Sequence, residues 1–375
     1  MKEKLQERYS IRELLTRKAL YNLILGQRSN GKSYQVKHMS LYEAYTGLDY
    51  ITHKPLGKRR FLAYIRRWKE ELKTGDVESY FDDMPISEIT KGDYDCVSVW
   101  RSDIFFARLN KETGKKERGM KIGHCFCLTS ATHYKSLMFP DILNLIFEEF
   151  LTDMYLPREV ENLESIVSTI ARTEEVHVYM IGNTISRLCP YFREWELTNC
   201  LKQKAGTIDI YKKKTTAYDP NTSNWVNTTI LIAVEYCQQN SKTGIMSFGR
   251  ASRSINGGEW ECDEQPHLQK RFNEYTLKYK ILFKSGDFAF MVTLLQDNEK
   301  RELTLYCYPA SETSSAKRIV SDDYSMDRFH TNHLTPLTKY DKIVIDLLNV
   351  GKICFSDNLT GTEFFTLLNN RKGGF

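Results

Sequence analysis

Residues Gly26–Ser33 form an eight-residue G-x-x-x-x-G-K-S segment, a spacing typical of phosphate-binding loops. The apolar run Tyr21–Leu25 precedes it and a helical pattern over 33–45 follows, as such a loop requires. Its two glycines allow backbone N–H groups to face a polyphosphate at a helix N-terminus. We expect Lys32 to reach the β- and γ-phosphates and Ser33 to bind Mg²⁺. The segment predicts a site for ATP and Mg²⁺; the alternative is a glycine-rich loop that binds nothing.

An acidic motif follows further along the chain, where the apolar strand pattern Ile142–Phe147 ends in two carboxylates. Glu148 stands where a carboxylate usually holds Mg²⁺ through water, and Glu149 is placed to polarise an attacking water. Their side chains diverge on an extended strand, so one can face the metal and the other the water. A kinase needs no such base, so the pair favours hydrolysis. The alternative is a strand that ends in two solvated acids.

Two further polar residues follow the acidic pair. Asn183 ends the strand pattern Val176–Ile181, and in ATPases with an extra strand between the phosphate loop and the acidic motif an Asn here senses the γ-phosphate or the water. Arg172 ends the helical pattern 159–171. An arginine delivered to a neighbouring subunit stabilises transition-state charge. The alternative is a solvated arginine at a helix C-terminus.

The chain has 375 residues, a length that favours two domains. Its composition, with 41% hydrophobic and 27% charged residues, is that of a globular protein. No apolar run approaches the ~18 residues of a membrane span, so we expect no membrane partner. Nine cysteines are scattered along the chain, which suits a reducing compartment. The pair Cys125 and Cys127 is spaced C-x-C, whereas zinc sites more often use C-x₂₋₄-C.

The net charge of +5 is concentrated in one segment. Residues 201–255 hold eight lysines and arginines against three acids. Such a cluster favours a polyanionic partner, and we expect Lys212, Lys213 and Lys214 to follow a DNA phosphate backbone. A second basic cluster covers 54–69. A solvated face is the alternative for either cluster.

Changes in the residue pattern along the chain predict three parts. They are a P-loop ATPase domain over 1–205, a small linker module over 206–255 and an α+β domain over 256–375. In the first part, short apolar runs alternate with helical patterns, which favours an α/β fold with a mainly parallel sheet. A turn at Asn110–Gly114 predicts a β-hairpin. The expected elements are strands at Asn22–Leu25, Phe61–Ile65, Val97–Trp100, Cys125–Leu128, Leu143–Phe147 and Val176–Ile181, and helices at Ile11–Ala19, Lys32–Tyr45 and Glu159–Arg172. In the last part they are an antiparallel meander at Tyr275–Phe283, Phe288–Leu295 and Arg301–Tyr308, and helices at Lys339–Asn349 and Thr360–Asn370.

The order and spacing of these motifs resemble the DNA-packaging ATPases of phi29-like phages, which are ASCE-type P-loop proteins. The resemblance covers about Arg17–Phe192 and is weak beyond, around Gly351–Asn358. It rests on the following segments: Gly26 to Tyr34 with Arg28, Gly31, Lys32 and Ser33; Arg66 to Leu72; Lys135-Ser136 before Phe139-Pro140; Phe147 to Phe150; Tyr155 to Val160; and Asn183 before Pro190-Tyr191-Phe192.

The resemblance implies a homo-oligomeric ring motor, a homopentamer, at the portal vertex of a viral procapsid in the host cytoplasm. Such a motor pumps double-stranded DNA inward, and whether it needs a structural RNA stays open. The resemblance also implies that Arg28 and Tyr34 belong to the nucleotide site, that Arg172 acts in trans and that Lys69 lies near an intersubunit nucleotide. It implies an RNase H-type C-terminal domain without nuclease activity.

One departure from the family and two alternative functions stay open at this point. Relatives of this kind carry Asp before the glutamate that acts as base, whereas this chain has Glu148, whose extra methylene still permits a water-mediated Mg²⁺ contact. A nuclease needs several acids converging on metal ions, whereas Asp287, Asp297 and Asp346 have the context of surface acids. The alternatives to a motor are a nucleoside or small-molecule kinase and a non-hydrolysing nucleic-acid adaptor.

Overall fold

The computed structural model describes residues 9–28, 30–152, 154–172, 175–184, 187–219, 224–237, 263–285, 288–310, 316–321, 330–331 and 337–372. These residues divide into two compact units. The first holds 9–184 and 189–237, and the second holds 187–188 and 263–372.

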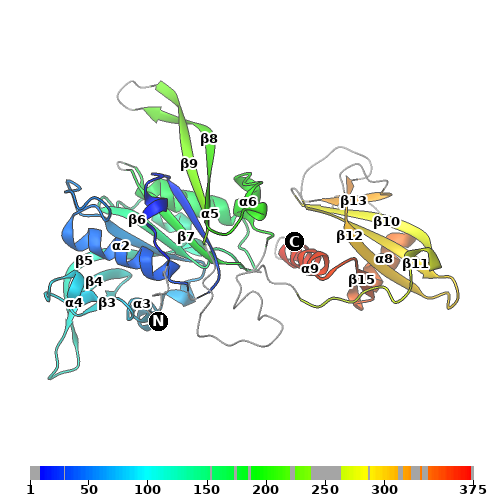
Figure 1. The fold of residues 1–375 in the computed structure, drawn as a ribbon, viewed down its shortest axis with the longest axis horizontal. Coiled ribbons are helices and arrows are strands. Elements are labelled where there is room, and N and C mark those ends of the chain that lie inside the picture. Colours follow the sequence, from blue (N-terminus) through cyan, green and yellow to red (C-terminus); the bar gives the residue numbers. More distant parts are fainter. Residues whose placement is uncertain are drawn as a thin grey trace, which may run out of the picture. The chain divides into compact units, whose positions relative to one another are not determined.

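Within its described residues, the first unit is built on a nine-stranded sheet with the order β3-β4-β5-β2-β6-β7-β1-β9-β8 (Figure 1). The six strands from β5 to β9 in this order are parallel neighbours. The remaining neighbours are antiparallel. The strands are β1 (Tyr21–Gly26), β2 (Phe61–Arg66), β3 (Cys96–Trp100), β4 (Asp103–Leu109), β5 (Lys116–Cys127), β6 (Ile142–Glu148), β7 (His177–Asn183), β8 (Thr207–Asp219) and β9 (Asn224–Tyr236).

Helices cover this sheet, and α2 packs against β2, β5, β6 and β7. Every residue of β1 and β6 is buried, as expected of parallel strands covered on both faces. The α/β class, the hairpin β4–β5 and all six expected strands are confirmed, but the helix expected at Ile11–Ala19 shortens to α1. The helices are α1 (Arg12–Leu15), α2 (Lys32–Thr46), α3 (Thr74–Tyr80), α4 (Ile86–Ile89), α5 (Glu159–Ile170) and α6 (Pro190–Glu194), with 3₁₀ turns η1 (Lys69–Leu72), η2 (Leu128–Tyr134) and η3 (Cys200–Lys202).

The parallel register brings the motifs to one edge of the sheet. Strand β7 lies between β1 and β6, so the extra strand expected between phosphate loop and acidic motif is present. Gly26 pairs with Asn183, and Glu148 pairs with Ile181. The carboxyl ends of all three strands therefore meet.

A separate linker module was predicted for 206–255, but the described residues 206–219 and 224–237 belong to the first unit. Strand β9 pairs with β1 in parallel, and β8 pairs with β9 in a long hairpin that extends beyond the rest of the sheet (Figure 1). The buried residues Ile232, Ala233 and Val234 anchor the hairpin in the core. Only the half of the hairpin beside β1 is buried. The other half is exposed and polar in sequence, and this is why the segment was interpreted as a linker. Residues 238–255 lie outside the described part.

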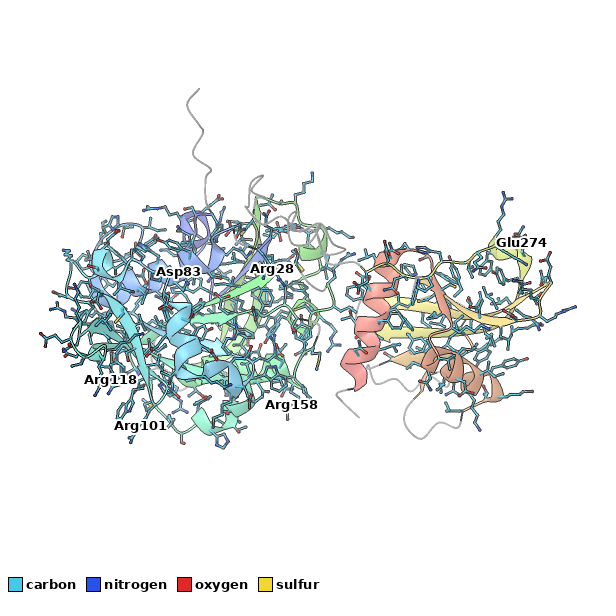
Figure 2. The ribbon with its side chains drawn as sticks, turned by 90° about the horizontal axis from the view of Figure 1, so that it is seen from below. Arg28, Asp83, Arg101, Arg118, Arg158 and Glu274 are labelled. Atoms are coloured by element: carbon cyan, nitrogen blue, oxygen red, sulfur yellow. The ribbon has the colours of Figure 1, made fainter. Side chains whose placement is uncertain are left out.

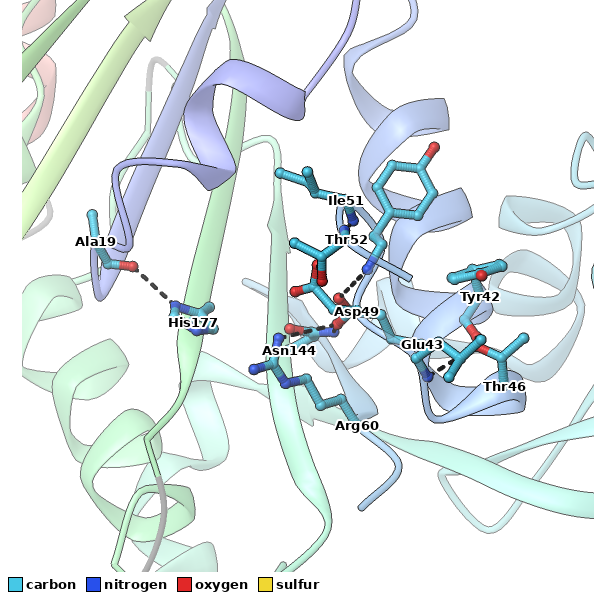
Figure 3. A network of polar contacts seen from close by, with 12 residues as sticks. Ala19, Tyr42, Glu43, Thr46, Asp49, Ile51, Thr52, Arg60, Asn144 and His177 are labelled. Atoms are coloured by element: carbon cyan, nitrogen blue, oxygen red, sulfur yellow. Dashed lines mark hydrogen bonds and ion pairs between the residues drawn. The ribbon is translucent and has the colours of Figure 1, made fainter. Parts of the chain in front are cut away.

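A buried polar network fixes the C-terminal end of α2 to the sheet (Figure 3). Glu43 is 2% exposed and accepts hydrogen bonds from the Asn144 side chain at 2.9 Å and the Tyr50 backbone at 3.1 Å. Arg60 forms an ion pair with the same carboxylate at 3.4 Å. Because a buried carboxylate is costly unless it is paired and hydrogen-bonded, this set of partners holds α2 in one position on β6.

The second unit is an α+β domain with a six-stranded mixed sheet of order β14-β13-β10-β11-β12-β15 in its described residues. Strands β10, β11 and β12 form the expected antiparallel meander, and β13 and β14 continue the sheet in parallel beside β10. The RNase H-type fold that the family resemblance implied for this domain stays a prediction. The elements are η4 (Phe272–Glu274), β10 (Tyr275–Ser285), β11 (Phe288–Asp297), β12 (Leu303–Pro309), β13 (Arg318–Ser321), β14 (His330–Thr331), α8 (Lys339–Asn349), β15 (Ile353–Phe355) and α9 (Asn358–Lys372).

Candidate nucleotide-binding and hydrolysis site

The phosphate-binding loop joins β1 to α2 through two glycines with left-handed or related backbone angles. Gly31 has φ +96° and precedes the first residue of α2, and Gly26 has φ +145°. A Cβ added at Gly26 would also meet the Cys237 side chain at 3.2 Å. Since L-residues rarely adopt these angles, the spacing of the glycines is dictated by the turn itself. The predicted loop geometry is thus present.

Lys32 turns its ammonium group into this loop. Its Nζ donates to the carbonyls of Gly26 at 3.1 Å and Gln27 at 2.6 Å, and lies 3.5 Å from the Asn183 side-chain oxygen. The side chain is buried, and burial lowers the Lys32 pKa to about 8, although Cys237 and Glu148 act in the opposite direction. A phosphate group would supply the negative charge that such a buried ammonium needs.

Glu148 and Ser33 face each other across the edge of the sheet. Glu148 is 7% exposed, and burial raises its pKa even though hydrogen bonds from Tyr80 and Ser33 lower it. Tyr80 donates to Glu148 Oε1 at 2.6 Å. A hydroxyl and a carboxylate are oxygen ligands of the kind Mg²⁺ prefers, directly or through water. These residues therefore fit the predicted metal site.

Glu149 differs from Glu148 in exposure and in backbone geometry. It follows β6 with φ +55°, and its side chain is 61% exposed. Arg66 Nη2 donates to Glu149 Oε2 at 2.9 Å. Left-handed angles are costly for a non-glycine residue and persist where neighbouring structure enforces them.

Arg67 provides that enforcement. Its guanidinium donates to the backbone carbonyls of Glu149 and Phe150, both at 2.9 Å, and forms a two-bond ion pair with Glu159 at 2.7 and 2.8 Å. Tyr191 donates to the same Glu159 carboxylate at 3.1 Å. Arg67 and Glu159 are 6% and 2% exposed. The turn that carries Glu149 is therefore tied to the first residue of α5.

A pocket opens at this edge of the sheet. It brings together eight of the predicted site residues, and Arg28 and Asp83 on its wall are labelled in Figure 2. Asn30 and Asp83 were not expected from the sequence, because Asn30 fills a variable position of the loop motif and Asp83 belongs to no motif. The lining residues are Arg28, Asn30, Gly31, Lys32, Ser33, Tyr34, Asp83, Glu148, Glu149, Ile181, Gly182 and Asn183.

Of the other predicted site residues, Gly26 ends β1 at the start of the loop, and two lie elsewhere on the same unit. Arg172 is exposed just beyond the end of α5, where it donates to the Lys135 carbonyl. Lys69 is exposed at the start of η1. Neither belongs to the residues that line the pocket of their own chain.

The three predicted DNA-binding lysines lie on β8 with alternating environments. Lys212 and Lys214 are exposed, whereas Lys213 donates to Glu196 at 2.7 Å. Successive side chains of a strand point to opposite faces, so Lys212 and Lys214 share a face that Lys213 does not.

The described residues contain no group of three or more His, Cys, Asp or Glu placed to hold a metal ion. No described helix has both the length and the apolar composition that a membrane span requires.

Comparison with known proteins identifies the family. The podovirus DNA encapsidation protein family (Gp16) matches residues 4–228. The DNA packaging protein of Bacillus phage B103 is 27% identical over 336 residues, covering 82% of this chain and 88% of the relative. That of Bacillus phage phi29 is 25% identical over 299 residues, covering 77% and 76%. A solved structure of the bacteriophage phi29 viral genome packaging motor assembly shares the fold, with a TM-score of 0.51, 20% identity and coverage of 97% of this chain and 99% of that chain. The chain thus belongs to the podovirus DNA encapsidation protein family.

Proposed function

We propose that this protein hydrolyses ATP in a homo-oligomeric ring and uses the energy to drive double-stranded DNA into a viral procapsid. The observation that carries the proposal is the convergence of Lys32, Ser33, Glu148, Glu149 and Asn183 on one pocket. A kinase would need a binding site for its second substrate in place of a water-polarising base. A non-hydrolysing adaptor would have no use for Glu149 beside the buried Glu148.

Each residue has a separate task in this proposal. The loop N–H groups and Lys32 bind the phosphates, and Ser33 and Glu148 hold Mg²⁺, which supplies positive charge against the β- and γ-phosphates. Glu149 polarises the attacking water, and Asn183 contacts the water or the γ-phosphate. Arg28 and Tyr34 line the pocket and would contact the nucleotide.

Arg172 and Lys69 support the ring by their position. Both are exposed and outside the pocket of their own chain, where a residue that serves a neighbouring subunit has to lie. We propose that each contacts the nucleotide of an adjacent subunit, and that five subunits act at the portal vertex in the host cytoplasm.

The proposal gives the second unit no nuclease activity. Asp297 accepts hydrogen bonds from the backbone N–H groups of Glu299 and Lys300, and an ion pair joins it to Lys270 at 3.1 Å. Asp297 thus shapes the turn between β11 and β12. Asp346 lies on α8, and Asp287 falls outside the described residues.

The test is ATP turnover with and without double-stranded DNA. Lys32→Ala should lose ATP binding, whereas Glu149→Gln should bind ATP and lose turnover by several orders of magnitude. Glu70→Gln, an exposed acid on η1, is the matched control and should turn over normally. Normal turnover in Glu149→Gln, or a turnover that DNA does not change, would contradict the proposal.

A further inference from the structure

Tyr80 contacts Glu148, one of the two residues proposed to hold Mg²⁺, although Tyr80 belongs to none of the nucleotide-binding motifs. It is the last residue of α3, and its hydroxyl donates to Glu148 Oε1 at 2.6 Å. Its ring stacks on Tyr64 with centroids 4.5 Å apart and planes inclined by 30°. The phenol is therefore held in place by its ring as well as by its hydrogen bond.

Lys37 on α2 contacts Tyr80 as well and so fixes the end of α3. It is 4% exposed, and its Nζ donates to the Tyr80 carbonyl at 2.6 Å, pairs with Asp83 and lies 4.5 Å from the Tyr80 ring centroid. Lys37 follows Ser33 by four residues on α2, so both side chains lie on one face of that helix. The helix that presents the Ser33 hydroxyl therefore also anchors the residue that holds Glu148.

The contact with Tyr80 matters because this chain has a glutamate at 148, where the family resemblance led us to expect an aspartate. A glutamate has one more rotatable bond than the aspartate of similar ATPases, so its carboxylate is less well fixed unless a neighbour holds it. Tyr80 occupies one carboxylate oxygen, and Ser33 contacts the same side chain.

We propose that Tyr80 is the positioning residue for Glu148: it holds Oε1 so that the carboxylate faces Ser33 and a Mg²⁺ ion beside it. The inference rests on the proposed ATPase function. Hydrogen bonds to metal-binding carboxylates orient them, and their loss typically costs 10–100-fold in metal affinity.

Tyr80→Phe tests the proposal, because it removes one hydroxyl and keeps the stacking ring. The measurement is binding of a fluorescent ATP analogue at fixed concentration while Mg²⁺ is varied. We expect the Mg²⁺ concentration at half-saturation to rise about tenfold, with binding at saturating Mg²⁺ retained. Tyr45→Phe is the control, since Tyr45 donates to Asp93, outside the pocket, and it should leave the Mg²⁺ dependence unchanged.

A double-mutant cycle with Glu148→Asp makes the test specific. The shorter side chain cannot reach the phenol, so Tyr80→Phe should have no further effect on the Mg²⁺ dependence in that background. An unchanged Mg²⁺ dependence in the single variant, or an equal shift in both backgrounds, would overturn the proposal.

Lys32→Ala separates this inference from the proposed function. If Lys32→Ala binds the nucleotide like the parent, the site assignment and the Tyr80 proposal both fail. If Lys32→Ala loses binding while Tyr80→Phe responds to Mg²⁺ like the parent, the Tyr80 proposal alone fails.

Discussion

At the scale of single residues, the two adjacent glutamates have opposite surroundings. Glu148 is buried against Tyr80 and Ser33, which suits a fixed metal-binding group. Glu149 is mostly exposed and already paired with Arg66. Arg66 donates to Glu149 Oε2, so a water polarised by Glu149 would use the other carboxylate oxygen or replace Arg66. The fixed carboxylate and the exposed one therefore suit the different tasks proposed for them.

A third glutamate near the loop gives a pH-dependent prediction. Glu235 on β9 accepts a hydrogen bond from Tyr9 at 2.8 Å, and burial raises its pKa to about 7, although that hydrogen bond lowers it. Between about pH 4.3, the ordinary glutamate pKa, and pH 7, the folded chain binds a proton that the unfolded chain has lost. Stability therefore falls as pH rises through this window and stays reduced above it.

Glu235→Gln should remove this loss of stability. Its melting temperature should exceed the parent's by several degrees at pH 8, and the difference should shrink as pH falls toward 4.5. Glu70→Gln, an exposed acid, should match the parent at both ends. A difference between Glu235→Gln and the parent that is constant across the range would show that Glu235 is not held protonated.

At the scale of elements, the sequence was sufficient where motif and strand are adjacent in the chain. The loop Gly26–Ser33, the acidic pair and Asn183 were predicted with their strands, because strand polarity places them at one edge. The hairpin β8–β9 was assigned wrongly to a linker, since its pairing with β1 joins segments far apart in sequence. Tyr80 and Arg67 were missed as site residues for the same reason: their roles depend on contacts that no local spacing encodes.

Arg67 provides a prediction about how the elements position Glu149. Arg67→Lys keeps the charge but cannot bind two carbonyls and Glu159 at once, because it lacks the planar fork. We expect ATP binding to stay near the parent value and kcat to fall about 100-fold, as small misplacements of a catalytic group do. Steady-state kcat and KM measure this separation.

The control for Arg67 is Arg158, an exposed arginine at the N-cap of α5. Arg158 precedes Glu159 and pairs with Glu161 instead, so Arg158→Lys should leave kcat unchanged. A parallel loss of kcat and ATP affinity in Arg67→Lys would show general damage to the fold and contradict the positioning role.

The hairpin β8–β9 gives a second prediction at this scale. If Lys212 and Lys214 contact DNA phosphates from their shared face, replacing both with Ala should flatten the log–log salt dependence of DNA binding by roughly one unit per lost contact. Lys213→Ala is the matched control, because Lys213 is already paired with Glu196. An equal effect of the control, or an unchanged slope in the double variant, would move the DNA contact elsewhere, such as the basic cluster at 54–69.

At the scale of the whole molecule, the family assignment and the position of Arg172 lead to the same expectation. The pocket is lined by Lys32, Arg28 and the two glutamates, whereas Arg172 is exposed outside the pocket of its own chain. In the proposed ring of identical subunits, each copy would offer its Arg172 to the pocket of the next and so add positive charge against the transition state. Hydrolysis would thereby depend on the ring.

Mixing two inactive variants tests this dependence. Arg172→Ala should bind ATP nearly as the parent does and hydrolyse it slowly, since arginine fingers contribute about 10³ to 10⁵ in rate. Lys32→Ala should be inactive because it fails to bind ATP. In mixed rings, some interfaces join the intact pocket of an Arg172→Ala subunit to the intact arginine of a Lys32→Ala subunit, so the mixture should regain ATPase activity. If verified mixed rings stay as inactive as each variant alone, Arg172 acts within its own subunit or takes no part in hydrolysis.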